Sequence, residues 1–120
     1  MIPVARTPAA LAAFSGGLAV IIGAFGAHGA ANAQAAAWLE TGGHYLLAHA
    51  IAALLALAFG TPRAGRTAAW LFLIGGWIFC GTLALMATGG PPWLGAVTPI
   101  GGTALIVGWL VLAAGFLTRR

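Results

Sequence analysis

Charged side chains are scarce in this 120-residue chain. It contains no aspartate and no lysine, and its charged residues, one glutamate and five arginines, make up 5% of the sequence, whereas 62% is hydrophobic. A soluble domain carries about 25% charged residues. The chain therefore lacks the polar groups that a water-facing surface needs, and we expect an integral membrane protein with a single domain over residues 1–120.

Residues suited to catalysis, metal binding or nucleic-acid binding are equally few. Cys80 is the only cysteine, which excludes an internal disulfide, and it lies in an apolar run where it is interpreted as a small packing residue. Ser15 is the only serine, and no acid–base set accompanies either nucleophile, so we expect no enzyme activity. The arginines form no basic cluster with interleaved aromatics, so we expect no nucleic-acid partner.

Four apolar stretches are long enough to cross a bilayer. A hydrocarbon core about 30 Å thick needs about 20 residues of α-helix. The stretches span residues 8–29, 41–60, 67–88 and 99–117, and polar or helix-breaking segments separate them. The chain is therefore predicted to be an all-α membrane protein, folded as a compact bundle of four transmembrane helices.

Short motifs indicate where some of these helices begin and end. Thr7-Pro8 and Thr98-Pro99 each place a capping hydroxyl before a proline, which is favourable at the first helical position. Thr67 is a third candidate cap, for the third helix. The run Gly89-Gly90-Pro91-Pro92 cannot continue a helix and predicts a turn before the fourth span.

The arginines predict the orientation of the chain. They are Arg6 before the first span, Arg63 and Arg66 between the second and third, and Arg119 and Arg120 after the fourth. With four spans all of them lie on one side, and the positive-inside rule makes that side cytoplasmic, so both termini are expected there. A signal peptide cleaved at Ala31-Asn32-Ala33 is the alternative, but the apolar run exceeds the roughly 7–15 residues typical of one.

Small residues recur every four positions in each span, as expected where helices pack closely in lipid. The ridges are Ala19, Gly23 and Ala27; Ala48, Ala52, Ala56 and Gly60; Gly76, Cys80, Ala84 and Thr88; and Ala104 and Gly108. Trp77 and Trp109 fall near mid-span, where an indole N–H needs an acceptor. We interpret both as packed side chains bonded to a facing carbonyl or threonine, with the wall of a binding pocket as the alternative.

Most of the remaining ionisable side chains gather at the outer ends of the first two spans. They are His28, Glu40, His44, Tyr45 and His49. Glu40 and His44 are four residues apart, as are Tyr45 and His49, so each pair shares a helix face. His44 and His49 point about 140° from each other. His49 lies roughly 12 Å below residue 41, inside the hydrocarbon, where a histidine is a functional candidate.

Four interpretations of this cluster are open. A metal site needs three or four converging ligands, and the spacing here matches no known motif. Haem ligation needs two histidines on facing helices at similar depth. A pocket for a lipid-like or quinone-like headgroup is the strongest functional candidate, and a hydrogen-bonded clamp that holds the first loop against the helix ends is the structural alternative. We expect no resident metal or other cofactor.

Several strings along the chain match known signatures in order and spacing. The first is Gly23-Ala24-Phe25-Gly26-Ala27-His28-Gly29, and the second is Glu40-Thr41-Gly42 with Tyr45 and His49-Ala50. Gly81 and Leu83 follow loosely, then Trp93-Leu94-Gly95, Thr98-Pro99-Ile100-Gly101-Gly102 and Gly108-Trp109. Together they resemble a small family of four-span membrane proteins typified by the bacterial YgdD proteins and eukaryotic transmembrane protein 256.

Members of this family are multi-pass proteins of the bacterial cytoplasmic membrane or of mitochondria without an established activity, and the resemblance implies such a protein, which we expect in the bacterial cytoplasmic membrane. Three residues depart from the family's pattern, and two of them, Cys80 and Thr82, stand where serines are usual. His44 stands where the family usually has arginine, a natural partner for the neighbouring glutamate. We hypothesise that a Glu40–His44 pair replaces the permanent one and can lose its charge near neutral pH.

The leading hypothesis for function is an accessory or ligand-binding membrane protein. Its outer cluster would contact a lipid-like or quinone-like headgroup, or a partner subunit, which includes another copy of the chain. The alternative is a small proton-linked transporter or channel. Against it, Glu40 lies near the outer interface and no span carries the buried acid that a proton relay needs. Loss of proton-coupled flux in Glu40→Gln proteoliposomes would favour transport.

Overall fold

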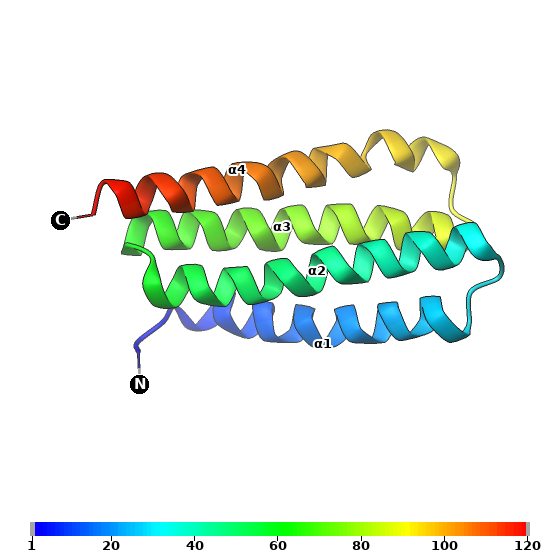
Figure 1. The fold of residues 1–120 in the computed structure, drawn as a ribbon, viewed down its shortest axis with the longest axis horizontal. Helices are drawn as coiled ribbons and strands as arrows, with labels where there is room; N and C mark the ends of the chain where they lie inside the picture. The colour runs from blue at the N-terminus through cyan, green and yellow to red at the C-terminus, as the bar shows by residue number, and fades with distance from the viewer. Residues whose placement is uncertain (1, 120) are drawn as a thin grey trace.

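Four long α-helices make up most of the computed structural model, which describes residues 2–119 (Figure 1). They are α1 (Arg6–His28), α2 (Ala33–Phe59), α3 (Pro62–Ala87) and α4 (Thr98–Leu117), with a short 3-10 helix η1 (Pro92–Ala96) leading into α4. All four are long and apolar enough to cross a membrane. The predicted all-α fold with four spans is confirmed. Arg120 lies outside the described residues.

Helix α2 begins well before the predicted boundary at residue 41. Its first residue is Ala33, and the Asn32 side chain caps it by accepting a hydrogen bond of 2.8 Å from the backbone N–H of Ala35. Hydropathy marks the part of a helix inside the hydrocarbon, whereas this helix continues beyond it through an alanine-rich segment of high helix propensity. Glu40 therefore lies within α2 rather than at its start.

Helix α3 also begins earlier than expected, and Thr67 is not its cap. The helix begins at Pro62, and Thr61 caps it by accepting a bond of 3.3 Å from the N–H of Ala64. The Thr67 hydroxyl instead donates to the Arg63 carbonyl, 2.9 Å away. A capping hydroxyl followed by proline, the motif that predicts a helix start, therefore begins α3 at Thr61-Pro62.

The other two predicted caps are also wrong. Helix α1 begins at Arg6, and Ala5 precedes it without any side-chain cap, so Thr7 is already inside the first turn. Thr98 is the first residue of α4, but its hydroxyl donates to the Leu94 carbonyl because η1 leads directly into the helix. The side chain therefore faces a carbonyl instead of the free N–H groups that a cap serves.

The turn between α3 and η1 is confirmed at the glycine–proline run. Gly89 has a φ of +99°, a conformation that glycine adopts without strain. The N–H of Gly90 bonds to the Leu85 carbonyl at 2.7 Å, which closes the end of α3. The chain then reverses and returns through η1 into α4 (Figure 1).

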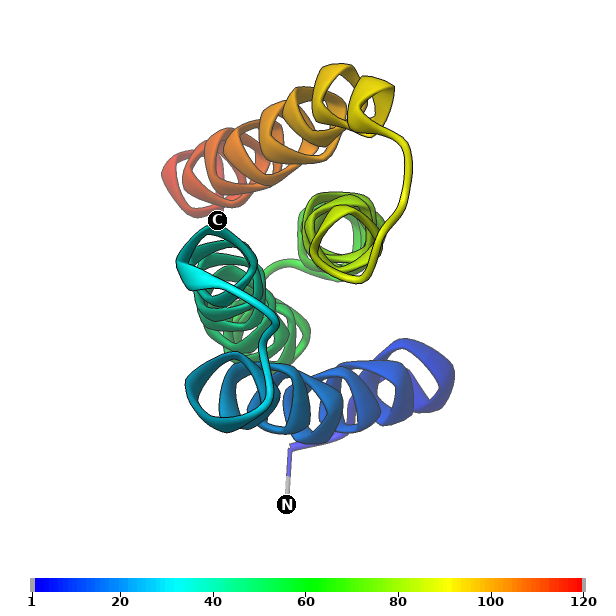
Figure 2. The same cartoon turned by 90° about the vertical axis from the view of Figure 1, so that its right-hand side faces the viewer.

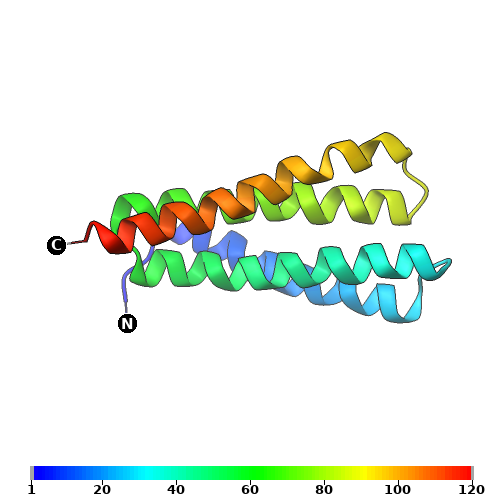
Figure 3. The same cartoon turned by 45° about the horizontal axis from the view of Figure 1, so that its top comes forward.

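The bundle has a flattened cross-section, with principal extents of 51 × 29 × 18 Å. Viewed along the helices, α2 and α3 lie side by side in the middle, with α1 and α4 at opposite edges (Figure 2). Helix α1 packs on α2 and more lightly on α3, while α4 packs mainly on α3. In a third view the α1–α2 pair and the α3–α4 pair form two distinct hairpins (Figure 3).

Glycines allow these helices to approach closely. A Cβ at Gly43 of α2 would come 2.9 Å from the Ala19 carbonyl of α1, and one at Gly42 would come 3.3 Å from Cys80 of α3. On α4 the contact residues are Gly101, Gly108 and Gly115, which face α3 at seven-residue intervals. Some members of each predicted small-residue ridge, such as Ala19, Ala56, Cys80 and Gly108, therefore contact another helix of the same chain, whereas Ala27, Ala48 and Thr88 are exposed.

Both ends of the chain lie at the same end of the bundle as the α2–α3 turn (Figure 1). This end carries the described arginines, which are Arg6, Arg63, Arg66 and Arg119. Arg119 donates to the Phe59 carbonyl at 2.6 Å and so satisfies the C-terminal end of α2. The described arginines thus lie at one end of the bundle, as expected from the sequence, and the positive-inside rule predicts that this end is cytoplasmic.

Candidate functional site

A buried histidine near the middle of α2 anchors the candidate site. His49 is 7% exposed, and its Nδ1 lies 2.7 Å from the Tyr45 carbonyl one turn earlier. Because a carbonyl can only accept, Nδ1 carries the proton and donates it. Nε2 then accepts a bond of 3.0 Å from the Trp109 indole N–H of α4. The neutral ring in this tautomer satisfies both of its nitrogens, as an intramembrane histidine requires.

The second mid-span tryptophan has a matching arrangement. Trp77 of α3 donates to Ser15 of α1 at 2.9 Å, and the Ser15 hydroxyl donates in turn to the Leu11 carbonyl at 2.7 Å. Ser15 is fully buried. In both cases an indole bonds to a side chain that donates to the carbonyl four residues back in its own helix. The expected hydrogen bonds exist, but the acceptors are serine and histidine rather than a carbonyl or threonine.

His49 and Trp109 belong to a group of five aromatic rings from three helices. Tyr45 stacks on His49 with centroids 6.1 Å apart and packs on Phe79 at 5.0 Å. Phe72 lies 5.4 Å from His49 and 4.9 Å from Trp109. We call Tyr45, His49, Phe72, Phe79 and Trp109 the aromatic cluster. It joins α2, α3 and α4 where the backbones of α2 and α4 are not closely packed.

A groove lies above the aromatic cluster, toward the end of the bundle that carries the α1–α2 loop. Its volume is about 560 Å³. Its lining comes from α2 (Trp38), α3 (Phe79, Leu83, Met86), the turn and η1 (Gly90, Pro92, Gly95) and the start of α4 (Thr98, Pro99). We call this space the α2–α4 groove. Phe79 belongs to both the groove and the aromatic cluster, and Tyr45 packs on Phe79 without itself lining the groove.

The side chains of the predicted outer cluster separate into two groups. Tyr45 and His49 belong to the aromatic cluster, whereas His28, Glu40 and His44 lie outside it and are exposed, with the His44 ring edge-on to Tyr45 at a centroid distance of 6.4 Å. The stem of Glu40 lies against α1, where a Cβ at Gly26 would come 3.2 Å from its Cγ. Within residues 2–119, no three His, Cys, Asp or Glu side chains come together as metal ligands.

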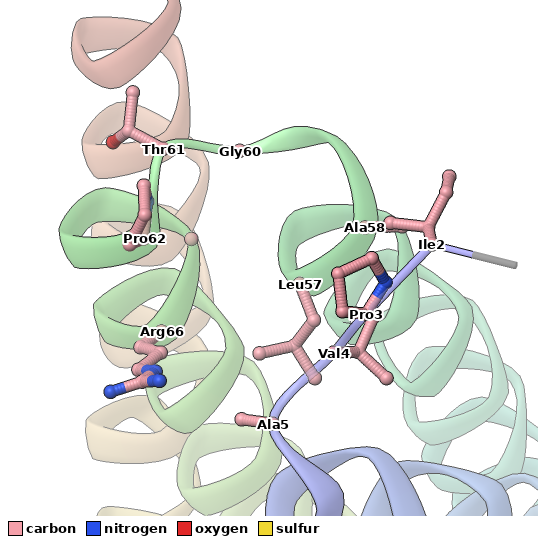
Figure 4. A pocket seen from close by; sticks show the side chains of 11 residues that line it. Ile2, Pro3, Val4, Ala5, Leu57, Ala58, Gly60, Thr61, Pro62 and Arg66 are labelled. Carbon is pink, nitrogen blue, oxygen red and sulfur yellow. The ribbon is translucent and has the colours of Figure 1, made fainter.

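A second hollow, which the sequence did not suggest, lies at the basic end. It measures about 370 Å³. Figure 4 shows the N-terminal segment, from Ile2 to Ala5, running past Leu57 of α2 to form one wall. Arg66 lines the rim, and the remaining lining is mostly aliphatic. This hollow has no cluster of polar side chains comparable to that around His49.

Four apolar helices, a polar and aromatic centre and one basic end define a small multi-pass helical protein of the membrane. The chain belongs to the family described as "Protein of unknown function (DUF423)", whose model matches residues 22–102. The resemblance to the YgdD proteins is thereby confirmed.

Curated relatives match over nearly their whole length. The UPF0382 membrane protein of Haemophilus influenzae is 39% identical over 113 residues, covering 88% of this chain and 89% of the relative. The inner membrane protein YgdD of Escherichia coli K12 is 33% identical over 118 residues, covering 91% and 88%. YwdK of Bacillus subtilis is 34% identical over 109 residues, covering 85% and 89%. No solved structure matches. The protein is a multi-pass protein of the bacterial cytoplasmic membrane.

Proposed function

We propose that this protein is a non-catalytic, ligand-binding protein of the cytoplasmic membrane. The α2–α4 groove would hold the ring or headgroup of a lipid-like or quinone-like molecule. The observation that carries the proposal is the groove itself, a space of about 560 Å³ with aromatic walls directly above the aromatic cluster. Small-molecule sites are typically concave, mostly apolar, and supplied with a few polar groups.

The lining of the groove favours an uncharged group. None of its side chains is ionisable, and the Thr98 hydroxyl already bonds to Leu94 and Thr82. Trp38 and Phe79 offer faces against which a flat ring can stack. The lining offers no cation to pair with an anionic headgroup. A quinone ring or the glycerol region of a lipid is uncharged, so it would lose little hydration free energy on entering the groove.

Tyr45 supplies the polar group of the proposed site. Its ring is held between His49 and Phe79, yet 45% of the residue is exposed. Among residues 2–119 its hydroxyl has no hydrogen-bond partner, so it can donate to a carbonyl oxygen of the ligand. The hydrogen bond from Trp109 fixes the His49 ring, on which the Tyr45 ring stacks. Tyr45 is therefore supported by a rigid neighbour.

Filling the groove tests this proposal. Gly95 lines the groove, and a Cβ there would meet only the Met86 sulfur, at 3.8 Å, so Gly95→Leu adds bulk at a position whose backbone tolerates a side chain. Gly17→Leu is the matched control, because a Cβ at Gly17 meets nothing within 4 Å. We expect native mass spectrometry of gently extracted protein to show a one-to-one small-molecule adduct in the parent and in Gly17→Leu, but not in Gly95→Leu.

Tyr45→Phe probes the polar contact. It keeps the ring and removes the hydroxyl, so we expect retained binding with an affinity about tenfold lower, the usual effect of one lost hydrogen bond to a ligand. A parent protein without any adduct, or an adduct that persists in Gly95→Leu, would refute the proposed site.

A further inference from the structure

One side of α2 is exposed along its whole length with the spacing of a helix–helix interface. The residues are Ala37, Thr41, His44, Ala48, Ile51 and Leu55, all exposed, and they follow one another at alternating intervals of four and three. We call this set the α2 face. The alternation is the a/d pattern by which two parallel helices pack side by side. Ala48, which the sequence assigned to a packing ridge, has no mate within the chain.

The α2 face and its edge carry polar groups at the outer interface and just inside the hydrocarbon. Counting about 1.5 Å per residue from residue 41, where the apolar stretch begins, Glu40 lies at the interface and His44 roughly 5 Å toward the bilayer centre. Both side chains are exposed. Ionisable residues within membrane spans almost always face protein or a water-filled cavity, because hydrocarbon offers them no partner.

Thr41, like Thr7 at the start of α1, differs from most threonines in the spans and at their ends. The hydroxyls of Thr67, Thr88, Thr98, Thr103 and Thr118 each donate to the carbonyl four residues earlier, and the Thr82 hydroxyl is bonded to that of Thr98. This local bond is the usual arrangement for threonine in a membrane helix. Among residues 2–119, the Thr41 hydroxyl makes no such bond and remains available to another acceptor.

We propose that the α2 face packs against the α2 face of a second copy of this chain, across a twofold axis along the membrane normal. In a parallel pair with this spacing, the knob at Thr41 inserts beside the partner's Glu40. The hydroxyl then donates to the partner's carboxylate, and symmetry makes the same bond a second time. His44 meets the partner's Thr41 and the partner's Ala48, and its ring carries an N–H donor in either protonation state.

A second copy suits this surface better than a ligand does. The donor Thr41 lies on the α2 face and the acceptor Glu40 lies at its edge, one residue earlier, so two copies related by a twofold axis can form the same bond reciprocally. Ala37, Thr41 and Ala48 are small and allow the two backbones to approach. The α2–α4 groove opens elsewhere, between α2, α3 and η1. The interface therefore goes beyond the proposed ligand site, and either can fail without the other.

Disulfide trapping in native membranes tests the geometry. In a Cys80→Ser background, Ala37→Cys and Ala48→Cys place single thiols on the α2 face. Ile21→Cys on α1 and Ile106→Cys on α4 are controls, since both positions are more than 60% exposed. We expect oxidation to give covalent dimers only with the two α2 cysteines. Equal trapping at all four positions, or none on α2, would overturn the proposal.

The polar contact is tested by a double-mutant cycle on the dimer in detergent. We expect Glu40→Gln and Thr41→Val each to weaken dimerisation about tenfold, and the double variant to be no weaker than either, because both changes remove the same bond. Thr103→Val on α4 is the matched control and should leave the dimer unchanged. Additive effects, or a parent that stays monomeric in nanodiscs, would contradict the proposed pairing.

Discussion

Trp109 and His49 show how a polar bond can organise an apolar interior. The indole and imidazole come from helices that pack little against each other, and each satisfies a group that would otherwise be unpaired in hydrocarbon. The same arrangement recurs at Trp77 and Ser15. These bonds are specific links between helices, because each has one donor and one acceptor at a defined depth.

Removing the indole N–H should therefore destabilise the bundle measurably. We expect Trp109→Phe to lower the free energy of unfolding by about 1–2 kcal/mol, since the ring volume is largely kept while Nε2 of His49 loses its donor. Thermal unfolding in detergent, followed by circular dichroism, measures the change.

The control for that measurement is Trp93→Phe. Trp93 lies in η1 and is 66% exposed, so we expect its substitution to leave the unfolding midpoint within error of the parent. Equal destabilisation by the two substitutions would show that the Trp109 bond contributes nothing specific.

The separation of the outer polar cluster was partly predictable at the residue scale. The 140° angle between His44 and His49 already placed them on different sides of a helix. The sequence did not show whether the His44 side or the His49 side of α2 faces the other helices. The partner of His49 is Trp109, 60 positions away, so no nearby residue indicates the contact. An intramembrane tryptophan and an intramembrane histidine, each needing one partner, were the only indication of the bond.

At the scale of single helices, hydropathy located every span but not every boundary. The alanine-rich segment after Asn32 is helical by propensity and capping, although it is too polar to count as membrane-spanning. Similarly, Thr61-Pro62 begins α3 ahead of its apolar run. Both signals are present in the sequence, but a search for apolar length alone does not use them.

The contact between α3 and α4 depends on the absence of side chains from α4. A Cβ at Gly101 would come 2.5 Å from the Phe79 backbone nitrogen and 2.6 Å from the Gly75 carbonyl. We expect Gly101→Val to separate the two helices and to cost more than about 2 kcal/mol of unfolding free energy, as overpacking against backbone does. Gly81→Ala is the control, since a Cβ there meets nothing within 4 Å.

Protease sensitivity of the η1 turn in membranes provides a second measurement of the same change. Separation of α4 should expose the turn around Gly89 and Gly90, so Gly101→Val should be cut there faster than Gly81→Ala. If the two variants unfold and are cut alike, close packing at Gly101 is not what holds α4 in place.

At the scale of the whole molecule, one basic end predicts one orientation. We expect green fluorescent protein fused after residue 119 to fluoresce, and alkaline phosphatase fused there to be inactive, because both report a cytoplasmic C-terminus. Alkaline phosphatase inserted in the loop at Ala31 should be active. The opposite pattern would place the α2–α4 groove at the cytoplasmic surface.

The two indole bonds also bear on the order in which this protein is made. Each joins a helix of the first hairpin to a helix of the second, α1 to α3 and α2 to α4. Ser15 and His49 precede the tryptophans that bond to them by 62 and 60 positions, so we expect them to enter the bilayer first during synthesis. In the interval the two side chains have only their own helix carbonyls as partners. Closure of the indole bonds is therefore a late event of biogenesis, when the second hairpin docks on the first.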